Sequence, residues 1–431
     1  MNDVATDHSL EALNPRVRMR FPMIDHDARG HPRVYLNTGA GSLTVDAAAQ
    51  ASGDAQGRLN PMPGVVVAGE AETAALHAGV RDLAADFLNA RSGREISFHQ
   101  SATAALFELA FGLRDALRPD ANIIVTDLDH MANVSPWETI FGEGRRLEIR
   151  RARLTSEGTL DLDHLLSLAD ARTAVVAVTA ASNGTGSLVA LKDVAAAVHD
   201  RAPEGLVVVD AVHQAPHGPL DVQASGLDAL VFSGYKVFGP MMGVLWGREK
   251  TLERLRPYRV ETNKDVLPGK LEMGMLNNAS VAALGAALDY LLWLADLAAG
   301  PRQVFPDRAS KFRSAMTSIA EYEMTITRRV LEGFRDLRLP RFRLFGLADP
   351  ARARERVPTF AFDVGGLTAT EAKRRLWAES AIQIADGNHY SAAVVRHLGR
   401  PEGICRTSFA HYDNAATADL FLDALTKLEK D

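Results

Sequence analysis

The sequence predicts an α/β protein whose main domain contains a mostly parallel β-sheet with helices on both faces. Short apolar runs typical of buried strands alternate with longer segments of helical composition, and polar residues follow several of these runs. Such alternation is typical of βαβ units, in which helices connect parallel strands. The chain has 431 residues, of which 47% are hydrophobic. It is therefore long enough to bury a large core and to divide into two domains.

The predicted elements divide the chain into three parts. Residues 1–33 form a polar N-terminal arm whose apolar patch at 21–24 packs on the body. Residues 34–300 form the large domain and residues 301–431 a smaller α+β domain, with a linking helical segment at about 281–335. In the large domain we expect strands starting at 34 and 96, strands at 123–126, 175–179, 206–209 and 229–232, and helices at 44–60, 69–90 and 190–200. In the small domain we expect strands at 357–364 and 405–410 and helices at 369–379, 390–398 and 414–429.

Composition and charge narrow the class of protein. The formal net charge is −6, so no basic excess indicates nucleic-acid binding. The single cysteine, Cys405, excludes internal disulfides and a Cys-rich metal site and suits a reducing compartment. The N-terminus lacks the pattern of a signal peptide, and the apolar segment 282–299 is too short and mixed to span a membrane. We therefore expect a cytoplasmic protein that binds neither nucleic acid nor membrane.

The stretch Leu206–Gly247 carries the most chemistry. The apolar run from Leu206 ends on Asp210, with His213 shortly after it, and a second apolar run leads into Lys236. In a parallel sheet the two strand ends meet at one edge, where α/β proteins bind ligands. Burying ionisable groups is costly unless they are paired or used. An acid and an amine delivered to one edge therefore indicate an active site.

Three further segments permit both a structural and a functional interpretation. The small-residue turn that ends at Gly41 is either a simple loop or a place where the backbone approaches a substrate. Ala102 and Thr103 follow a strand at the start of a helix, which suits either an N-cap or a phosphate site. His130 lies just past another strand end and is either structural or catalytic.

Taken together, five blocks in the same order resemble the class V aminotransferase and cysteine desulfurase superfamily. The blocks are Asp129–Trp137, Ser182–Gly186, Asp210–His213, Ser233–Pro240 and Cys405–Asp413. The resemblance implies a fold-type-I pyridoxal phosphate enzyme with a seven-stranded sheet. It also implies a homodimer with active sites at the subunit interface. The chain is similar to a desulfurase-like subgroup that lacks the catalytic cysteine.

The resemblance implies a role for each matching residue. Lys236 would bind pyridoxal 5'-phosphate as a Schiff base, Asp210 would face the pyridine nitrogen, and His130 would stack on the ring, so these three are the expected catalytic residues. The remaining roles are contact with the phenolic oxygen by Asn183 and His213, phosphate binding by Ala102, Thr103, Ser233 and Tyr235, and substrate binding by Arg406, Asn37, Gly39, Ala40, His389 and Tyr390.

The sequence departs from the family at three places. Desulfurases carry a nucleophilic cysteine on a loop that corresponds here to residues 385–392, which contain none. Met275 replaces a threonine in a loop that reaches the neighbouring subunit's phosphate site, and Tyr235 replaces the histidine before the lysine. Because Cys405 reads as a packed strand residue, an enzyme persulfide is disfavoured.

The expected reaction starts with an amino acid that displaces Lys236 to give an external aldimine and, after loss of the Cα proton, a quinonoid. Three outcomes stay open. Loss of a β-substituent makes the protein a C–S lyase, which we favour; reprotonation of the cofactor makes it an aminotransferase, and reprotonation of Cα an epimerase. A pyridoxal phosphate-binding protein without turnover is the alternative from another class.

Overall fold

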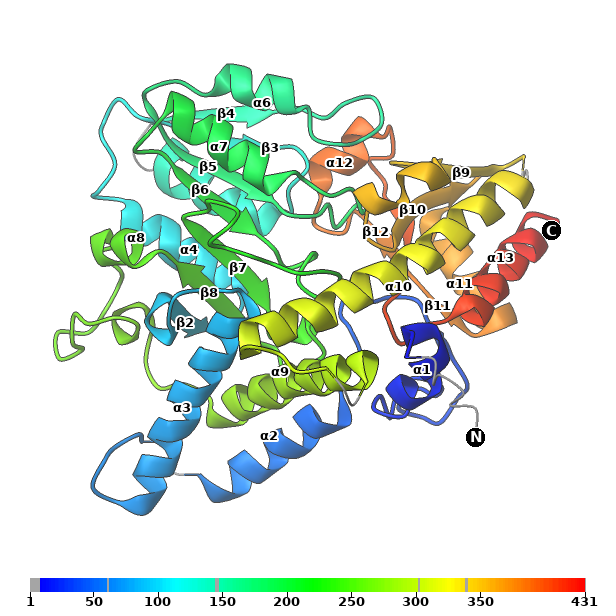
Figure 1. The fold of residues 1–431 in the computed structure, drawn as a ribbon. Coiled ribbons are helices and arrows are strands. Elements are labelled where there is room, and N and C mark those ends of the chain that lie inside the picture. Colours follow the sequence, from blue (N-terminus) through cyan, green and yellow to red (C-terminus); the bar gives the residue numbers. More distant parts are fainter. Residues whose placement is uncertain (1–7, 60–61, 144–146, 301–302, 338–339, 431) are drawn as a thin grey trace.

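The computed structural model describes every residue except 1–7, 60–61, 144–146, 301–302, 338–339 and 431 (Figure 1). Its centre is a seven-stranded sheet with the strand order β2-β8-β7-β6-β5-β3-β4. From β7 to β4 all neighbouring strands are parallel, while β8 is antiparallel to both of its neighbours. The expected α/β fold with a mainly parallel sheet is therefore confirmed. The strands are β2 (Ile96–His99), β3 (Asn122–Thr126), β4 (Glu148–Ala152), β5 (Thr173–Thr179), β6 (Leu206–Asp210), β7 (Ala229–Ser233) and β8 (Gly243–Gly247).

Helices cover both faces of this sheet (Figure 1). The central strands β6 and β7 are buried along their whole length, which explains their runs of valine, leucine and phenylalanine. In the register of the sheet, Asp210 stands beside Thr179 on one side and Val231 on the other. The helices around the sheet are α2 (Asp46–Arg58), α3 (Ala68–Phe87), α4 (Ala102–Leu113), α6 (Leu162–Leu168), α7 (Leu191–Arg201) and α8 (Glu249–Arg254).

The helix α9 (Asn278–Ala299) differs from its expected character. It has 22 residues and is long and apolar enough, by length and composition alone, to cross a membrane, so the expectation that this segment is too short was wrong. However, α9 packs against α2, α3 and the 30-residue helix α10 (Arg308–Leu337) (Figure 1). Its apolar residues, including Leu284, Leu288 and Leu291, are fully buried in the core. The composition of α9 is therefore that of a core helix.

The C-terminal part has its own antiparallel sheet of four strands in the order β12-β13-β10-β9. In its register Ala361 and Ala385 flank Arg406 on β13. The strands are β9 (Phe342–Phe345), β10 (Thr359–Val364), β12 (Ala385–Gly387) and β13 (Ile404–Ser408), and the helices are α11 (Ala369–Ser380), α12 (Ala392–His397) and α13 (Ala415–Lys430). A smaller α+β domain is thus present, and its boundary at residue 301 stays a prediction.

The N-terminal segment joins the two parts. The helix α1 (Leu10–Arg18) contacts α9 and α10, and β1 (Val34–Tyr35) pairs in parallel with β11 (Ile382–Gln383) of the C-terminal part. Between them Phe21 is 1% exposed. Its ring lies 5.5 Å from that of Tyr290, 4.6 Å from that of Tyr412 and 5.8 Å from that of Phe238, which follows Lys236 by two residues. Phe21 thus anchors this segment to the core.

We predict that Phe21→Ala lowers the free energy of unfolding by about 3–5 kcal/mol, because it leaves a cavity among large aromatic rings. Urea unfolding followed by circular dichroism measures this change. The matched control is Met23→Ala, since Met23 is 42% exposed two residues away. A loss of stability for Phe21→Ala no greater than that of the control would contradict the anchoring role.

Candidate functional site

A cavity of about 1140 Å³ lies between the carboxyl ends of the parallel strands and the loops around residues 385–390 and 401–406. All but one of the fifteen predicted site residues line it. The lining residues among them are Gly39, Ala40, Ala102, Thr103, His130, Asn183, Asp210, His213, Ser233, Tyr235, Lys236, His389, Tyr390 and Arg406. Asn37 does not line this cavity; its side chain is half-buried and its backbone forms a bridge with Ser408. The chemical roles of all fifteen stay predictions.

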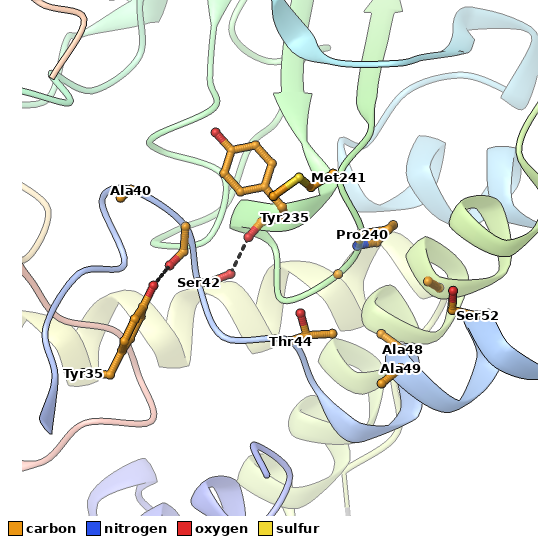
Figure 2. A pocket seen from close by; sticks show the side chains of 13 residues that line it. Tyr35, Ala40, Ser42, Thr44, Ala48, Ala49, Ser52, Tyr235, Pro240 and Met241 are labelled. Carbon is orange, nitrogen blue, oxygen red and sulfur yellow. Dashed lines mark hydrogen bonds between the residues drawn. The ribbon is translucent and has the colours of Figure 1, made fainter. Parts of the chain in front are cut away.

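Lys236 sits on a short 3-10 turn that directly follows β7. Its side chain is buried, and its Nζ donates to the carbonyl oxygen of Gly39. The turn is held in place by Ser42, whose Oγ donates to the carbonyl oxygen of Tyr235 at 2.8 Å (Figure 2) and to that of Lys236 at 2.8 Å. Ser42 was missed in the sequence because nothing local distinguishes a serine that contacts residues more than 190 positions away.

The segment Gly39–Ser42 is fixed from its other side as well. The hydroxyl of Tyr35 donates to the carbonyl oxygen of Gly41 at 2.6 Å (Figure 2). Ala40 and Tyr235 belong to the active-site cavity and also line the adjoining pocket of about 500 Å³ that Figure 2 shows. The turn that was predicted to approach a substrate therefore separates the two cavities. The carbonyl oxygen of Gly39 in this turn accepts the hydrogen bond from Lys236.

Burial and neighbouring charge both favour a neutral amine at Lys236. Burial, assisted by the cationic Arg406 and opposed by Asp210, lowers the pKa of Lys236 to about 7. Burial likewise raises the pKa of Asp210 to about 6, against the hydrogen bond that its Oδ1 accepts from the Val212 N–H at 2.9 Å. A lysine of this kind serves both as an imine former and as a proton carrier near neutral pH.

His130 has a structural contact and also lines the cavity, and its catalytic role stays a prediction. Its Nδ1 accepts a hydrogen bond from the Ala132 N–H at 3.0 Å, so the side chain caps a short 3-10 helix. Its ring also lines the cavity, 5.3 Å from the ring of Tyr390 and tilted by 32°. Burial, with the charges of Lys236 and Arg406, lowers the pKa of His130 to about 4. The imidazole is therefore neutral at physiological pH.

Asn183 and His213 have partners within the protein. The Nδ2 of Asn183 donates to the carbonyl oxygen of His389 at 2.7 Å, and its Oδ1 accepts from the Oγ of Ser391 at 2.6 Å. The Nε2 of His213 lies 3.0 Å from the Oγ1 of Thr359, and burial keeps the pKa of His213 well below its usual value. Asn183 thus lines the cavity and also holds the loop His389–Ser391 in place. The sequence did not reveal the contact with this loop.

Arg406 lies on β13, and its guanidinium group can bind an anion. Its Nη1 donates to the carbonyl oxygen of Asn183 at 2.7 Å, and no carboxylate among the described residues forms an ion pair with it. Burial lowers its pKa to about 10, so it stays charged. Gly39 allows this position, because a Cβ there would lie 3.0 Å from the guanidinium carbon. A bidentate guanidinium at this site suits a substrate carboxylate.

The observed donors fit pyridoxal phosphate. The lysine amine is buried without a carboxylate hydrogen-bond partner, and Asp210 lines the same cavity. The Oγ of Ser101 caps α4 by accepting from the Ala104 N–H at 3.1 Å, and the first residues of this helix, Ala102 and Thr103, line the cavity. An imine-forming amine, an acid for a ring nitrogen and a helix N-terminus for a phosphate are the set that this cofactor needs.

Cys405 is separated from this chemistry. It precedes Arg406 on β13 and its side chain points to the opposite face, where its Sγ lies 3.4 Å from the carbonyl oxygen of Ala369. Burial raises its pKa to about 12, and it does not line the cavity. The Cys405 thiol therefore lies outside the cavity that Lys236 lines.

The loop that contains Met275 begins at a firm anchor. Glu272 forms an ion pair with Arg81 at 2.6 Å and accepts a hydrogen bond from the Phe98 N–H at 2.9 Å. Beyond it Met273 is 61% exposed and Met275 is 53% exposed, and neither lines the cavity of its own chain. The loop is thus presented outward.

Comparison with known proteins gives a consistent result. The sequence model of the family "Aminotransferase class-V" matches residues 34–300. The chain is 30% identical to a cysteine desulfurase of Klebsiella pneumoniae (strain 342), over 96% of this chain and 98% of the relative. It is 31% identical to a probable cysteine desulfurase of Streptomyces coelicolor, over 95% of each. Among solved structures, the cysteine desulfurase CsdA of Escherichia coli is similar with a TM-score of 0.79 and 26% identity, over 96% of this chain and 98% of that one.

We predict that the apoprotein takes up pyridoxal phosphate with a pH dependence set by the lowered pKa of Lys236. Only the neutral amine attacks an aldehyde, so the rate should rise about tenfold per pH unit below about pH 7 and level off above it. The appearance of the visible absorbance band in stopped-flow measurements gives this rate. A rate still rising tenfold between about pH 8 and 9 would indicate an ordinary lysine.

Proposed function

Because the chain belongs to the class-V aminotransferase family and is a pyridoxal phosphate-dependent enzyme, we propose that it is a C–S lyase that acts on an amino acid. The reaction is a β-elimination in which no sulfur is transferred to the protein. The observation that carries this proposal is the position of Cys405, buried on the far face of β13 with a raised pKa. The loop at 385–392, which faces the cavity, contains no other thiol.

Bound pyridoxal phosphate supplies a covalent link for the substrate amine and an electron sink for the bond that breaks at Cα. Lys236 would hold the cofactor and, once released by substrate, would accept the Cα proton on its Nζ, which its lowered pKa permits. Asp210 would hold a proton on the pyridine nitrogen, and Arg406 would orient the substrate carboxylate. The neutral His130 would cover one face of the ring.

We also propose that the enzyme is a cytoplasmic homodimer. The outward Glu272–Asn277 loop supports this proposal, because its exposed methionines would be covered by a second copy. Met275 lacks the hydroxyl expected at a phosphate site, so this loop would contribute through backbone N–H groups. Sedimentation or light scattering of the holoenzyme measures the assembly.

We predict that Lys236→Ala removes the visible band of the lysine-bound cofactor and lowers turnover by at least about a thousandfold, since both the anchor and the proton carrier are lost. Spectra and product analysis of the holoenzyme measure these changes. Cys405→Ala is the matched control and should keep full activity if no persulfide forms.

The products distinguish the candidate reactions. Ammonia, pyruvate and a released thiol or sulfide support the lyase. A requirement for a keto-acid acceptor would instead establish an aminotransferase, and loss of optical activity without new products an epimerase. A cofactor band that no amino acid shifts would contradict enzymatic activity.

A further inference from the structure

The side chain of Tyr390 has an unusual position at the cavity. It lines the cavity, yet it is 71% exposed, so its ring stands at the mouth. His389 and Tyr390 have φ angles of 54° and 57°, in the left-handed region that side chains other than glycine rarely adopt. Two such residues in succession cost free energy, and backbone strain of this kind persists where the surrounding contacts enforce it.

Hydrogen bonds hold the backbone of residues 389–391 in place. The Tyr390 N–H donates to the Oδ1 of Asn388 at 2.9 Å, and its carbonyl oxygen accepts from the Met131 N–H at 2.8 Å. Asn183 clamps the flanking residues His389 and Ser391. The turn is therefore docked against the cavity, while the Tyr390 ring, whose neighbour is the His130 ring at 5.3 Å, keeps most of its surface exposed.

The cavity that Tyr390 lines also has apolar side chains in its wall. Phe107 on α4, which is 36% exposed, lines the same cavity together with Met131 and Pro401. Phe107 lies one helical turn after Thr103, so the two share a face of α4. A lone exposed aromatic residue is ordinary on a protein surface, but two aromatic residues and a methionine that line one cavity offer apolar surface to a ligand.

The charged groups of the cavity are already assigned, with one exception. Asp386 forms an ion pair with Lys373 at 2.7 Å, and Arg406 faces the position of a substrate carboxylate. Glu402 is the remaining carboxylate at the mouth, and it is exposed to solvent. An exposed carboxylate attracts a cationic side chain only weakly. The apolar surface is thus the stronger determinant of which side chain binds.

We propose that Tyr390 and Phe107 bind the side chain of the substrate and select an S-substituted cysteine with an apolar or aromatic substituent over free cysteine. This inference rests on the proposed lyase function. In the reaction the Cα–H and Cβ–S bonds break, the sulfur leaves with its substituent as a thiol after taking up a proton, and water converts the remaining enamine to pyruvate and ammonia. The step is redox-neutral and needs no acceptor of sulfur.

The first test measures binding without turnover. Phenylalanine, norleucine, alanine and lysine lack a β-leaving group, and their dissociation constants for the holoenzyme follow from shifts of the visible cofactor band. We expect phenylalanine and norleucine to bind at least about tenfold more tightly than alanine or lysine. Equal affinities for phenylalanine and alanine would overturn the proposal, and tightest binding of lysine would assign specificity to Glu402 instead.

The second test uses variants at Tyr390. Tyr390→Gly removes the ring and suits the left-handed backbone, so it preserves the turn; we expect it to weaken phenylalanine about tenfold and to leave alanine unchanged. Tyr390→Phe should retain both affinities. The control is Tyr258→Ala, which removes an aromatic ring that is 64% exposed elsewhere. If Tyr390→Gly weakened both amino acids equally, the residue would be structural and the proposal would fail.

Turnover of S-benzyl-cysteine and cysteine separates this inference from the proposed function. A higher kcat/KM for S-benzyl-cysteine with release of benzyl thiol supports both. Tight binding and transamination of S-benzyl-cysteine would contradict the lyase and support the selectivity. Elimination with a higher kcat/KM for cysteine would support the lyase and contradict the selectivity.

Discussion

The active site depends on keeping an amine buried next to a second cation. Lys236 and Arg406 line one cavity, and among the residues that the structure describes Asp210 is the carboxylate whose charge raises the pKa of the lysine. Burial penalises each charged form, and the proximity of the two cations penalises their joint ionisation. Lys236 is the group that loses its proton, because a guanidinium has a much higher pKa than an amine. As a result, the cavity contains one fixed positive charge for a carboxylate and one basic amine for chemistry.

The residues that line the cavity come from distant parts of the chain. Asn183 connects its own segment with β13 and with the loop that contains Tyr390. Its carbonyl oxygen accepts from Arg406, while its side chain holds His389 and Ser391. Arg406, which we propose to bind the substrate carboxylate, and the loop that carries Tyr390 therefore share one support. In our proposal, Asn183 structurally connects carboxylate binding with side-chain selection.

The sequence was sufficient to predict the parallel sheet and the strand ends that carry Asp210 and Lys236, because continuous apolar runs are typical of buried strands. It did not predict β4, whose sequence from Glu148 to Ala152 is charged because it lies at an edge of the sheet. The cavity residues were predicted through the resemblance of motifs and not from local pattern. The roles of Ser42 and of Asn183 in holding loops were not predicted, because both depend on contacts across more than 190 residues.

The pairing of β1 with β11 gives the N-terminal segment a mechanical role. Residues 34–38 are hydrogen-bonded to the small domain, since the Ser408 N–H donates to the carbonyl oxygen of Leu36 and the Thr38 hydroxyl to that of Phe409. The next residue, Gly39, accepts from the amine of Lys236 in the large domain. Five residues of backbone thus connect the sheet that carries Arg406 to the amine that we propose holds the cofactor, so the positions of these two groups depend on each other.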